Sequence, residues 1–159
     1  MNWQQLCGNS YLKNLPFKKE LNKFGQVVLT PLSETLSVLQ GQIILKLIAV
    51  AEGKGNVFSE CPIKTLDNIK IADVAWISTQ RHHSAKKGSV YVIAPEICLE
   101  LTPVQNNEKI TLFKRKLYFE AGAKEVWLCG EDGDIIFYNQ QGRIAQSVLM
   151  PNFPYHIDA

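Results

Sequence analysis

The sequence lacks the features that mark a zinc protein or a disulfide scaffold. Its cysteines lie far apart, at Cys7, Cys61, Cys98 and Cys129. No two of them are separated by two residues, and the histidines do not lie near them, so a zinc site has little support. A chain of 159 residues also buries enough surface to fold without disulfides. We expect a cytoplasmic protein with free thiols.

Long apolar runs and a strong excess of one charge are absent too. The most apolar stretch, Ile43 to Ala51, has nine residues and contains Lys46, whereas a bilayer span needs about 20 residues. Residues 1–5 have neither the basic start nor the apolar run of a secretory signal. The net charge is +2, which does not by itself argue for nucleic acid. We therefore expect neither a membrane helix nor a signal peptide.

The order of apolar patterns predicts one domain over residues 1–159, of the α/β class and the α+β type. Ser33 caps a predicted helix from Glu34 to about Glu52, and a second helix is predicted over 107–121. The predicted strands are 26–29, 57–63, 70–77, 89–101 (bent by Pro95), 124–129, 135–138 and 144–149. A polar loop is expected at 79–88. Because several strands follow one another directly, we expect a mixed, mostly antiparallel sheet flanked by helices.

Two carboxylates interrupt strands that are otherwise apolar. Asp73 lies in the strand 70–77, which is apolar on both faces, and Glu100 lies deep in the next apolar strand. Burying a carboxylate is costly unless it is paired or bound to a cation. Backbone donors or an arginine would satisfy Asp73 equally well. Glu96 lies about 13 Å from Glu100 along the strand, so we favour Glu100 as the site residue.

A lysine interrupts the predicted inner face of the second helix. At about 100° per residue, the expected core stripe consists of Ile110, Phe113, Leu117 and Ala121. Lys114 falls at the border of this stripe, and Tyr118 lies one turn further along. Such a lysine either extends to the surface or meets a carboxylate in a polar pocket. Two acids with a lysine form a unit that binds Mg²⁺ and activates water against a phosphate.

Four segments resemble the Uma-type restriction endonuclease family of bacterial proteins, which belongs to the PD-(D/E)xK nuclease superfamily. They are Leu15–Gly25, Ile71–Trp76, Ala94–Leu101 and Lys114–Leu128. The resemblance extends over about residues 15–157. It implies a restriction-endonuclease-like core, a mixed sheet flanked by helices, with a Mg²⁺ site on the sheet.

The resemblance also implies roles for individual residues. The first acid of the family falls on Asp73 and the second on Glu100, and further acidic positions fall on Glu96 and Glu20. These four are the implied metal ligands. The family lysine falls on Lys114, so the implied catalytic residues are Asp73, Glu100 and Lys114.

The sequence departs from the family pattern in four respects. Ala72 replaces the proline before the first acid, and Leu36 replaces a histidine of the helix-entry region. Thr102 lies where the superfamily usually has its lysine. The Ser-Pro-Ser-Asn motif that follows the second acid in the family is reduced here to Thr102-Pro103-Val104-Gln105-Asn106.

The leading hypothesis is a DNA endonuclease that depends on Mg²⁺ or Mn²⁺. The candidate DNA contacts are Lys18, Lys19, Arg81, Lys86 and Lys87, with Lys109 and Arg115, and each suits a solvated surface equally well. A homodimer is compatible with cutting two strands. The alternative is a catalytically weakened nuclease fold that serves as a nucleic-acid-binding or interaction module. A Cys/His enzyme using His82 and His83 is a third hypothesis, against which an exposed polar loop is the favoured explanation.

Overall fold

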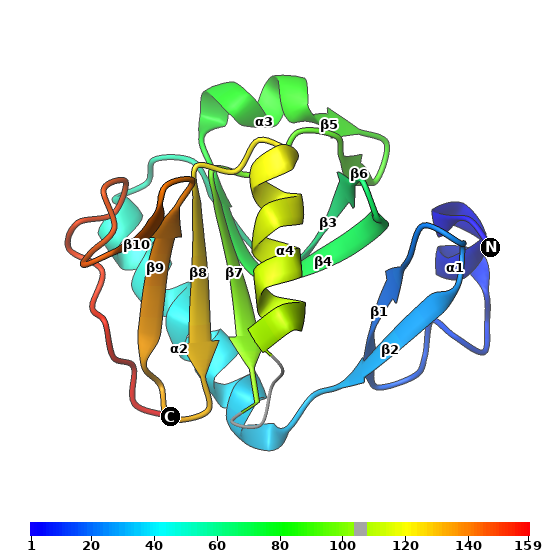
Figure 1. Ribbon diagram of the computed structural model, residues 1–159, viewed down its shortest axis with the longest axis horizontal. Helices are drawn as coiled ribbons and strands as arrows, with labels where there is room; N and C mark the ends of the chain where they lie inside the picture. The colour runs from blue at the N-terminus through cyan, green and yellow to red at the C-terminus, as the bar shows by residue number, and fades with distance from the viewer. Residues whose placement is uncertain (104–107) are drawn as a thin grey trace.

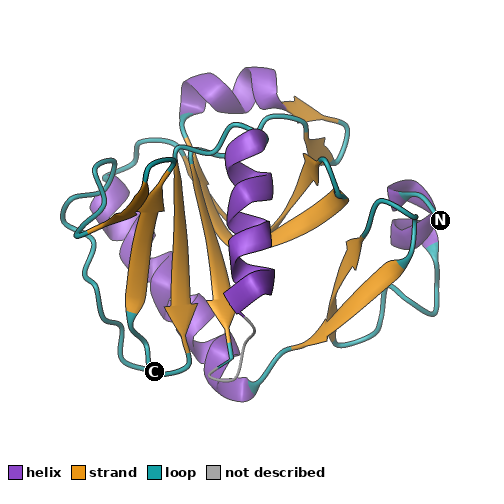
Figure 2. Cartoon of the chain, viewed as in Figure 1, coloured by secondary structure: helices purple, strands orange, loops and turns teal. Residues whose placement is uncertain are grey.

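A single mixed sheet forms the centre of the protein (Figures 1 and 2). The computed structural model describes residues 1–103 and 108–159, and within these residues the sheet has eight strands. Their spatial order is β10 (Gly142–Ile144), β9 (Ile135–Asn139), β8 (Glu125–Gly130), β7 (Ile97–Thr102), β4 (Asn68–Ile77), β3 (Asn56–Thr65), β6 (Val90–Tyr91) and β5 (Lys86–Lys87). The pairs β7–β8 and β3–β6 are parallel, and the other neighbours are antiparallel. The predicted mixed, mostly antiparallel sheet flanked by helices is thus confirmed.

Helix α2 (Glu34–Ala51) covers one face of this sheet. Ser33 begins it, because its hydroxyl accepts a hydrogen bond from the Leu36 main-chain N–H. Its inner row, Leu36, Leu39, Ile43 and Leu47, is buried and packs with Val74, Leu99 and Trp127 of the sheet. Among the described residues, α2 also has the length and hydropathy of a membrane-crossing helix. Core helices share that property, and the inner row of α2 packs in the protein core.

Helix α4 (Glu108–Glu120) covers the opposite face, in front of β7 in Figure 1. The predicted core stripe is wrong: Ile110 is 53% exposed and Phe113 is 48% exposed, while Leu117 and Tyr118 are buried. The helix is rotated about its axis so that Lys114 and Tyr118 point toward Glu100. Lys114 and Tyr118 of α4 therefore meet the carboxylates of Glu20 and Glu100 instead of an apolar core. The predicted start of this helix, residue 107, and residues 104–106 of the reduced family motif lie outside the described residues.

A small hairpin stands beside the main sheet (Figure 1). It consists of β1 (Phe17–Leu21) and β2 (Val27–Pro31), preceded by the short helix α1 (Trp3–Gly8). Its turn contains Gly25 at a φ of 75°, a conformation that favours glycine. The hairpin is fastened to the start of β4, where the Lys70 ammonium donates to the Leu21 carbonyl at 3.0 Å. Strand β1 therefore faces β4, the strand that carries Asp73.

Three local predictions need correction. The expected polar loop 79–88 contains helix α3 (Thr79–Ala85), whose first turn is capped by the Ser78 hydroxyl, which accepts the Arg81 N–H. This helix was not predicted, because its residues form no apolar row. The extended stretch 89–101 is divided into β6 and β7. The last predicted strand ends at Ile144, because the main-chain N–H groups of Val148 and Leu149 bond to a side chain, Glu125, instead of to a strand.

Candidate active site

Asp73 and Glu100 lie opposite each other on neighbouring strands. Strands β4 and β7 pair Val74 with Leu99, and one further step of this antiparallel register brings Asp73 opposite Glu100. The two residues are 2% and 4% exposed. Two carboxylates, 27 residues apart in the chain, are therefore held at one buried point of the sheet.

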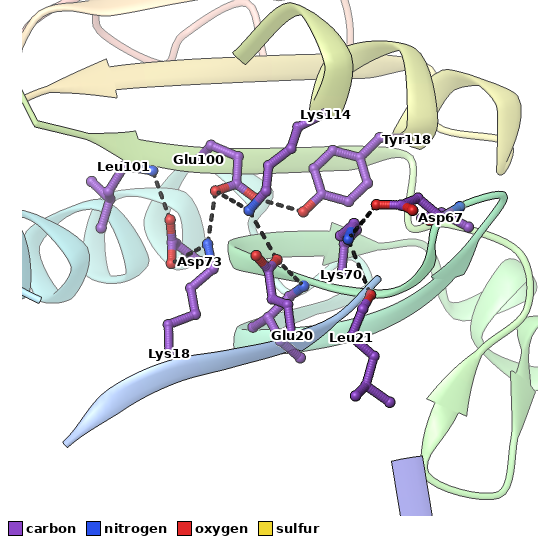
Figure 3. Close-up of polar contacts among 12 residues, drawn as sticks. Lys18, Glu20, Leu21, Asp67, Lys70, Asp73, Glu100, Leu101, Lys114 and Tyr118 are labelled. Atoms are coloured by element: carbon purple, nitrogen blue, oxygen red, sulfur yellow. Dashed lines mark hydrogen bonds and ion pairs between the residues drawn. The ribbon is translucent and has the colours of Figure 1, made fainter. Parts of the chain in front are cut away.

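The carboxylate of Asp73 is held by one main-chain donor and one cation. Its Oδ2 accepts the Leu101 N–H at 2.8 Å, and its Oδ1 lies 3.1 Å from the Lys18 ammonium (Figure 3). Its own main-chain carbonyl accepts the Gln40 side-chain amide of α2 at 2.8 Å. These contacts immobilise both the backbone and the carboxylate at this position.

The carboxylate of Glu100 is the centre of the cluster. Lys18 Nζ lies 2.8 Å from Oε2, and Lys114 Nζ lies 3.4 Å from both carboxylate oxygens. The Tyr118 hydroxyl, one turn after Lys114 on α4, donates to Oε1 (Figure 3). Groups from the hairpin and from α4 thus meet on a single side chain of β7.

Glu20 joins the cluster through Lys114. Its Oε2 lies 2.9 Å from Lys114 Nζ and also accepts the Ile71 N–H of β4 at 2.7 Å. Glu20 is 3% exposed. Lys114 is therefore held between Glu20 and Glu100, inside the charged cluster and not on the helix surface.

Burial and neighbouring charges shift the pKa values of the two opposed carboxylates in opposite directions. Burial and the nearby Glu100 charge raise the pKa of Asp73 to about 7, although Lys18 acts in the opposite direction. Burial also acts to raise the pKa of Glu100, but Lys114 and Lys18 outweigh it and hold that pKa below the usual range. Glu100 is the permanent anion of the pair, and Asp73 is the group that gains a proton first.

Two of the groups that bind Glu100, Lys18 and Tyr118, have pKa values above their usual ranges. For Lys18, burial lowers the pKa, but the charges of Glu100, Asp73 and Glu20 together raise it further than burial lowers it. Burial and the Glu100 charge raise the pKa of Tyr118 well above its ordinary value. Lys18 therefore stays protonated, and Tyr118 keeps the hydroxyl proton that it donates to Glu100.

The acids and lysine singled out in the sequence are partly brought together. Asp73, Glu100 and Lys114 meet, and Glu20 lies with them. Glu96 does not: its carboxylate accepts the Ser78 N–H at 3.1 Å and pairs with Arg81 at 3.7 Å, near the start of β7. Glu96 was expected to bind the metal, but it lies just before β7 and its carboxylate is bound to Ser78 and Arg81, away from Asp73.

Lys18 is the site residue that sequence reasoning placed elsewhere. It was expected on the surface as a DNA contact, yet it is 6% exposed and pairs with both opposed acids. The missing information was strand β1. In a strand, Lys18 and Glu20 share a face, and that pairing of a lysine with an acid two residues later was the available signal.

Arg81 is the second expected DNA contact that lies inside the fold. Its guanidinium donates to the main-chain carbonyls of Ala94 and Gly122 at 2.9 and 2.8 Å. By contrast, Lys86 and Lys87 are exposed on β5. Lys19 is partly exposed and donates to main-chain carbonyls of its own segment.

The remaining two candidate DNA contacts are on α4. Lys109 is exposed near the start of the helix. The guanidinium of Arg115 stacks over the Tyr138 ring at 3.8 Å, which restricts its freedom to reach a phosphate.

The donor set suits a hard divalent cation at one position. Asp73 and Glu100 each present an oxygen to one point, now held by the Lys18 ammonium at 3.1 and 2.8 Å. Mg²⁺ commonly binds one or two carboxylates and completes its shell with water and phosphate. Within the described residues, no three Asp, Glu, His or Cys side chains form a metal cluster, since Lys114 separates Glu20 from the opposed acids.

The cysteines and histidines do not form a nucleophilic site. Burial raises the pKa of the Cys61 thiol to about 12 and that of Cys98 well above its usual value, which disfavours a thiolate. His82 and His83 lie on α3, where His82 contacts the Tyr91 hydroxyl at 3.2 Å. The Cys/His hypothesis therefore receives no geometric support.

Comparisons with known proteins bear on the fold. No family model matches this chain, and no curated protein matches it either. Among solved structures, it is similar to a protein of Anabaena variabilis ATCC 29413 described as "a putative nuclease belonging to DUF820". The two chains are 16% identical with a TM-score of 0.66, and the match covers 84% of this chain and 80% of the other. At this identity the likeness shows the fold alone, an α+β fold that this chain shares with the protein described as a nuclease.

Proposed function

We propose that this protein is a DNA endonuclease of the Uma-type, PD-(D/E)xK kind, which hydrolyses phosphodiester bonds with Mg²⁺ or Mn²⁺. One observation carries the proposal: Asp73 of β4, Glu100 of β7 and Lys114 of α4 converge in a buried cluster on the sheet. The nuclease-like fold supports it as well. Buried ionisable groups with shifted pKa values cluster at functional sites.

Each residue of the cluster has a distinct task in this proposal. Asp73 and Glu100 would hold the cation, and the Leu101 N–H and the Tyr118 hydroxyl keep their carboxylates oriented. A bound Mg²⁺ supplies an activated water and neutralises charge that develops on the phosphate. Lys114, which Glu20 anchors at 2.9 Å, provides a fixed ammonium that orients the water or stabilises the phosphate.

The proposal extends to surroundings and assembly. Lys19, Lys86 and Lys87 remain the candidate DNA contacts, because they lie at the surface. We propose a cytoplasmic enzyme, consistent with its free thiols, and a homodimer, in which two sites would cut two strands.

The test is cleavage of plasmid DNA by purified protein with Mg²⁺ or Mn²⁺. We expect Asp73→Asn to lower the rate by at least about 100-fold, since loss of even an outer contact to a metal ligand typically costs roughly 10- to 100-fold. Glu96→Gln is the matched control, because Glu96 is also buried on the β7 side of the sheet but lies outside the cluster. Unchanged cleavage by Asp73→Asn would refute the assignment of the site.

A second candidate function is the weakened nuclease fold that acts as a binding or interaction module. The observation that favours it is Thr102, which lies where the superfamily has its lysine and whose hydroxyl donates to the Cys129 carbonyl at 3.5 Å. A metal titration separates the two candidates. Absence of Mg²⁺ or Mn²⁺ binding at millimolar concentration, together with retained DNA binding, supports the module.

A further inference from the structure

The Lys18 ammonium occupies the point between the two opposed acids. It lies 3.1 Å from Asp73 Oδ1 and 2.8 Å from Glu100 Oε2, and its side chain is 5% exposed. Figure 3 shows it reaching from β1, a strand outside the main sheet, to the carboxylates of β4 and β7. These two oxygens are the pair that the proposed function assigns to a divalent cation.

We infer that Lys18 is the built-in counter-cation of this site, that it competes with the divalent cation for Asp73 and Glu100, and that cation binding displaces it. The inference rests on the proposed function only for the identity of the cation site. An ammonium and a metal ion bound to the same two oxygens would repel each other strongly, because both are positive and would lie within a few ångströms of each other.

The charge balance of the cluster favours such an exchange. Metal binding needs Asp73 ionised, and the ionised carboxylates of Glu20, Asp73 and Glu100 then face the two ammonium groups of Lys18 and Lys114, which leaves one negative charge. Replacing the Lys18 ammonium with a divalent cation would neutralise the remaining negative charge. The exchange therefore brings the buried cluster closer to neutrality, the state that burial favours.

Lys18, and not Lys114, is the cation that yields. The shortest carboxylate contact of Lys114 is with Glu20 at 2.9 Å, and its distances to Glu100 are 3.4 Å. In the part of the chain that the structure describes, the Lys18 ammonium pairs with the two acids that would bind the metal and with no other acid. Its side chain also belongs to a two-stranded hairpin whose backbone is fastened at the turn end, through Leu21, so the side chain can leave while the hairpin stays.

The first experiment measures the accessibility of Lys18 in the unmodified protein. Lysines are acetylated with a water-soluble ester in EDTA or in Mn²⁺, without DNA, and the sites are quantified by mass spectrometry. We expect Lys18 to be protected in EDTA and to become labelled in Mn²⁺. Lys70 is the matched control, because it is equally buried but pairs with Asp67 and Leu21, away from the cation site.

The second experiment measures Mn²⁺ affinity by calorimetry for two variants. Lys18→Met should bind Mn²⁺ about tenfold or more tightly than the unmodified protein, since the competing state is removed. Lys114→Met removes the same charge from the same Glu100, so an equal gain would indicate a general field effect and overturn the inference. Lys19→Met controls for changes in the hairpin and should leave the affinity unchanged.

The outcomes separate this inference from the proposed function. Mn²⁺ binding with Lys18 still protected overturns the inference, while DNA cleavage is judged independently by Asp73→Asn. Absence of Mn²⁺ binding in both the unmodified protein and Lys18→Met also overturns it. Should Lys18→Met fail to fold, the labelling of the unmodified protein decides alone.

Discussion

Glu100 is the residue at which all the charges of the cluster meet. It binds two ammonium groups and one hydroxyl, whereas its neighbour Asp73 binds one ammonium and one main-chain N–H. The pKa of Glu100 is therefore held low, and that of Asp73 rises to about 7. Two buried carboxylates side by side are tolerated because their environments differ.

This difference predicts an unusual dependence of stability on pH. With its pKa raised to about 7, folded Asp73 keeps a proton that the unfolded chain loses near pH 4. The folded state then binds more protons, so the metal-free protein should lose stability as pH rises from about 4 to 7. Asp73→Asn carries no titrating group here, and its stability should fall less over this range. Thermal unfolding in EDTA between these pH values measures the difference.

Glu100 provides the internal comparison for this prediction. Its lowered pKa contributes stability above its unfolded value near pH 4.5, and that contribution is lost as pH falls below it. The two residues therefore act in separate pH ranges. Equal slopes for the unmodified protein and Asp73→Asn above pH 4.5 would mean that Asp73 is ionised in the metal-free fold.

Among the elements, β8 has a structural task that is separate from the charged cluster. Its first residue, Glu125, is 3% exposed and accepts four hydrogen bonds. The donors are Trp127 Nε1, the Ser147 hydroxyl, and the main-chain N–H groups of Val148 and Leu149. This carboxylate fastens the segment after β10 to the sheet, where the sequence pattern predicted another strand.

Removing this carboxylate should destabilise the whole sheet edge. Glu125→Ala leaves several buried donors without an acceptor, and each such donor costs about 1–3 kcal/mol, so we expect a loss of at least about 3 kcal/mol. Ser147→Ala removes one donor to Glu125 and also the acceptor of the Met150 main-chain N–H, so it should cost about 2 kcal/mol. Urea unfolding of both variants measures the costs. A loss for Glu125→Ala no greater than that for Ser147→Ala would show that other contacts hold this segment.

Helix α4 illustrates why helical periodicity alone misassigned a face. Ile110 and Phe113 were expected in the core and lie exposed, while Lys114 and Tyr118 face inward. The apolar pattern predicts which residues avoid water on average. It does not account for the carboxylates of Glu20 and Glu100, which come from distant segments and attract Lys114 to the inner face.

At the scale of the whole molecule, charge is distributed rather than concentrated. The net charge is +2, so attraction to DNA depends on local groups such as Lys86 and Lys87 of β5. Each phosphate contact contributes about 0.9 to the slope of log affinity against log salt concentration. These two exposed lysines are therefore testable as a pair.

Replacing both lysines with glutamine should weaken DNA binding and its salt dependence. If both contact phosphates, the slope for Lys86→Gln with Lys87→Gln should fall by about 1.8. Fluorescence anisotropy of a labelled duplex at several salt concentrations measures this slope. Lys46→Gln is the control, because Lys46 is exposed on α2, on the face of the sheet opposite α4. An unchanged slope in the double variant would remove β5 from the DNA interface.

The sequence was informative wherever a local pattern was sufficient. The capped helix α2, the apolar strand around Asp73 and the strand around Glu100 were all predicted, because apolar periodicity and capping depend on neighbouring residues. Helix α3 was missed, because its residues have no apolar row and only the Ser78 cap signals it. Glu96 was expected in the site because its residue type fits, but it lies before β7 and pairs with Arg81 instead.

The amino-acid sequence by itself determined that Asp73 and Glu100 lie where burial is unfavourable for a lone charge, since the surrounding residues are apolar, and it placed Lys114 at the border of a helix face. Only the tertiary structure decided which charges compensate one another. Lys18 and Glu20 come from a hairpin that packs beside β4, and no periodicity along the chain encodes that approach. Ion pairing acts over a few ångströms in space, whereas the sequence records only order along the chain.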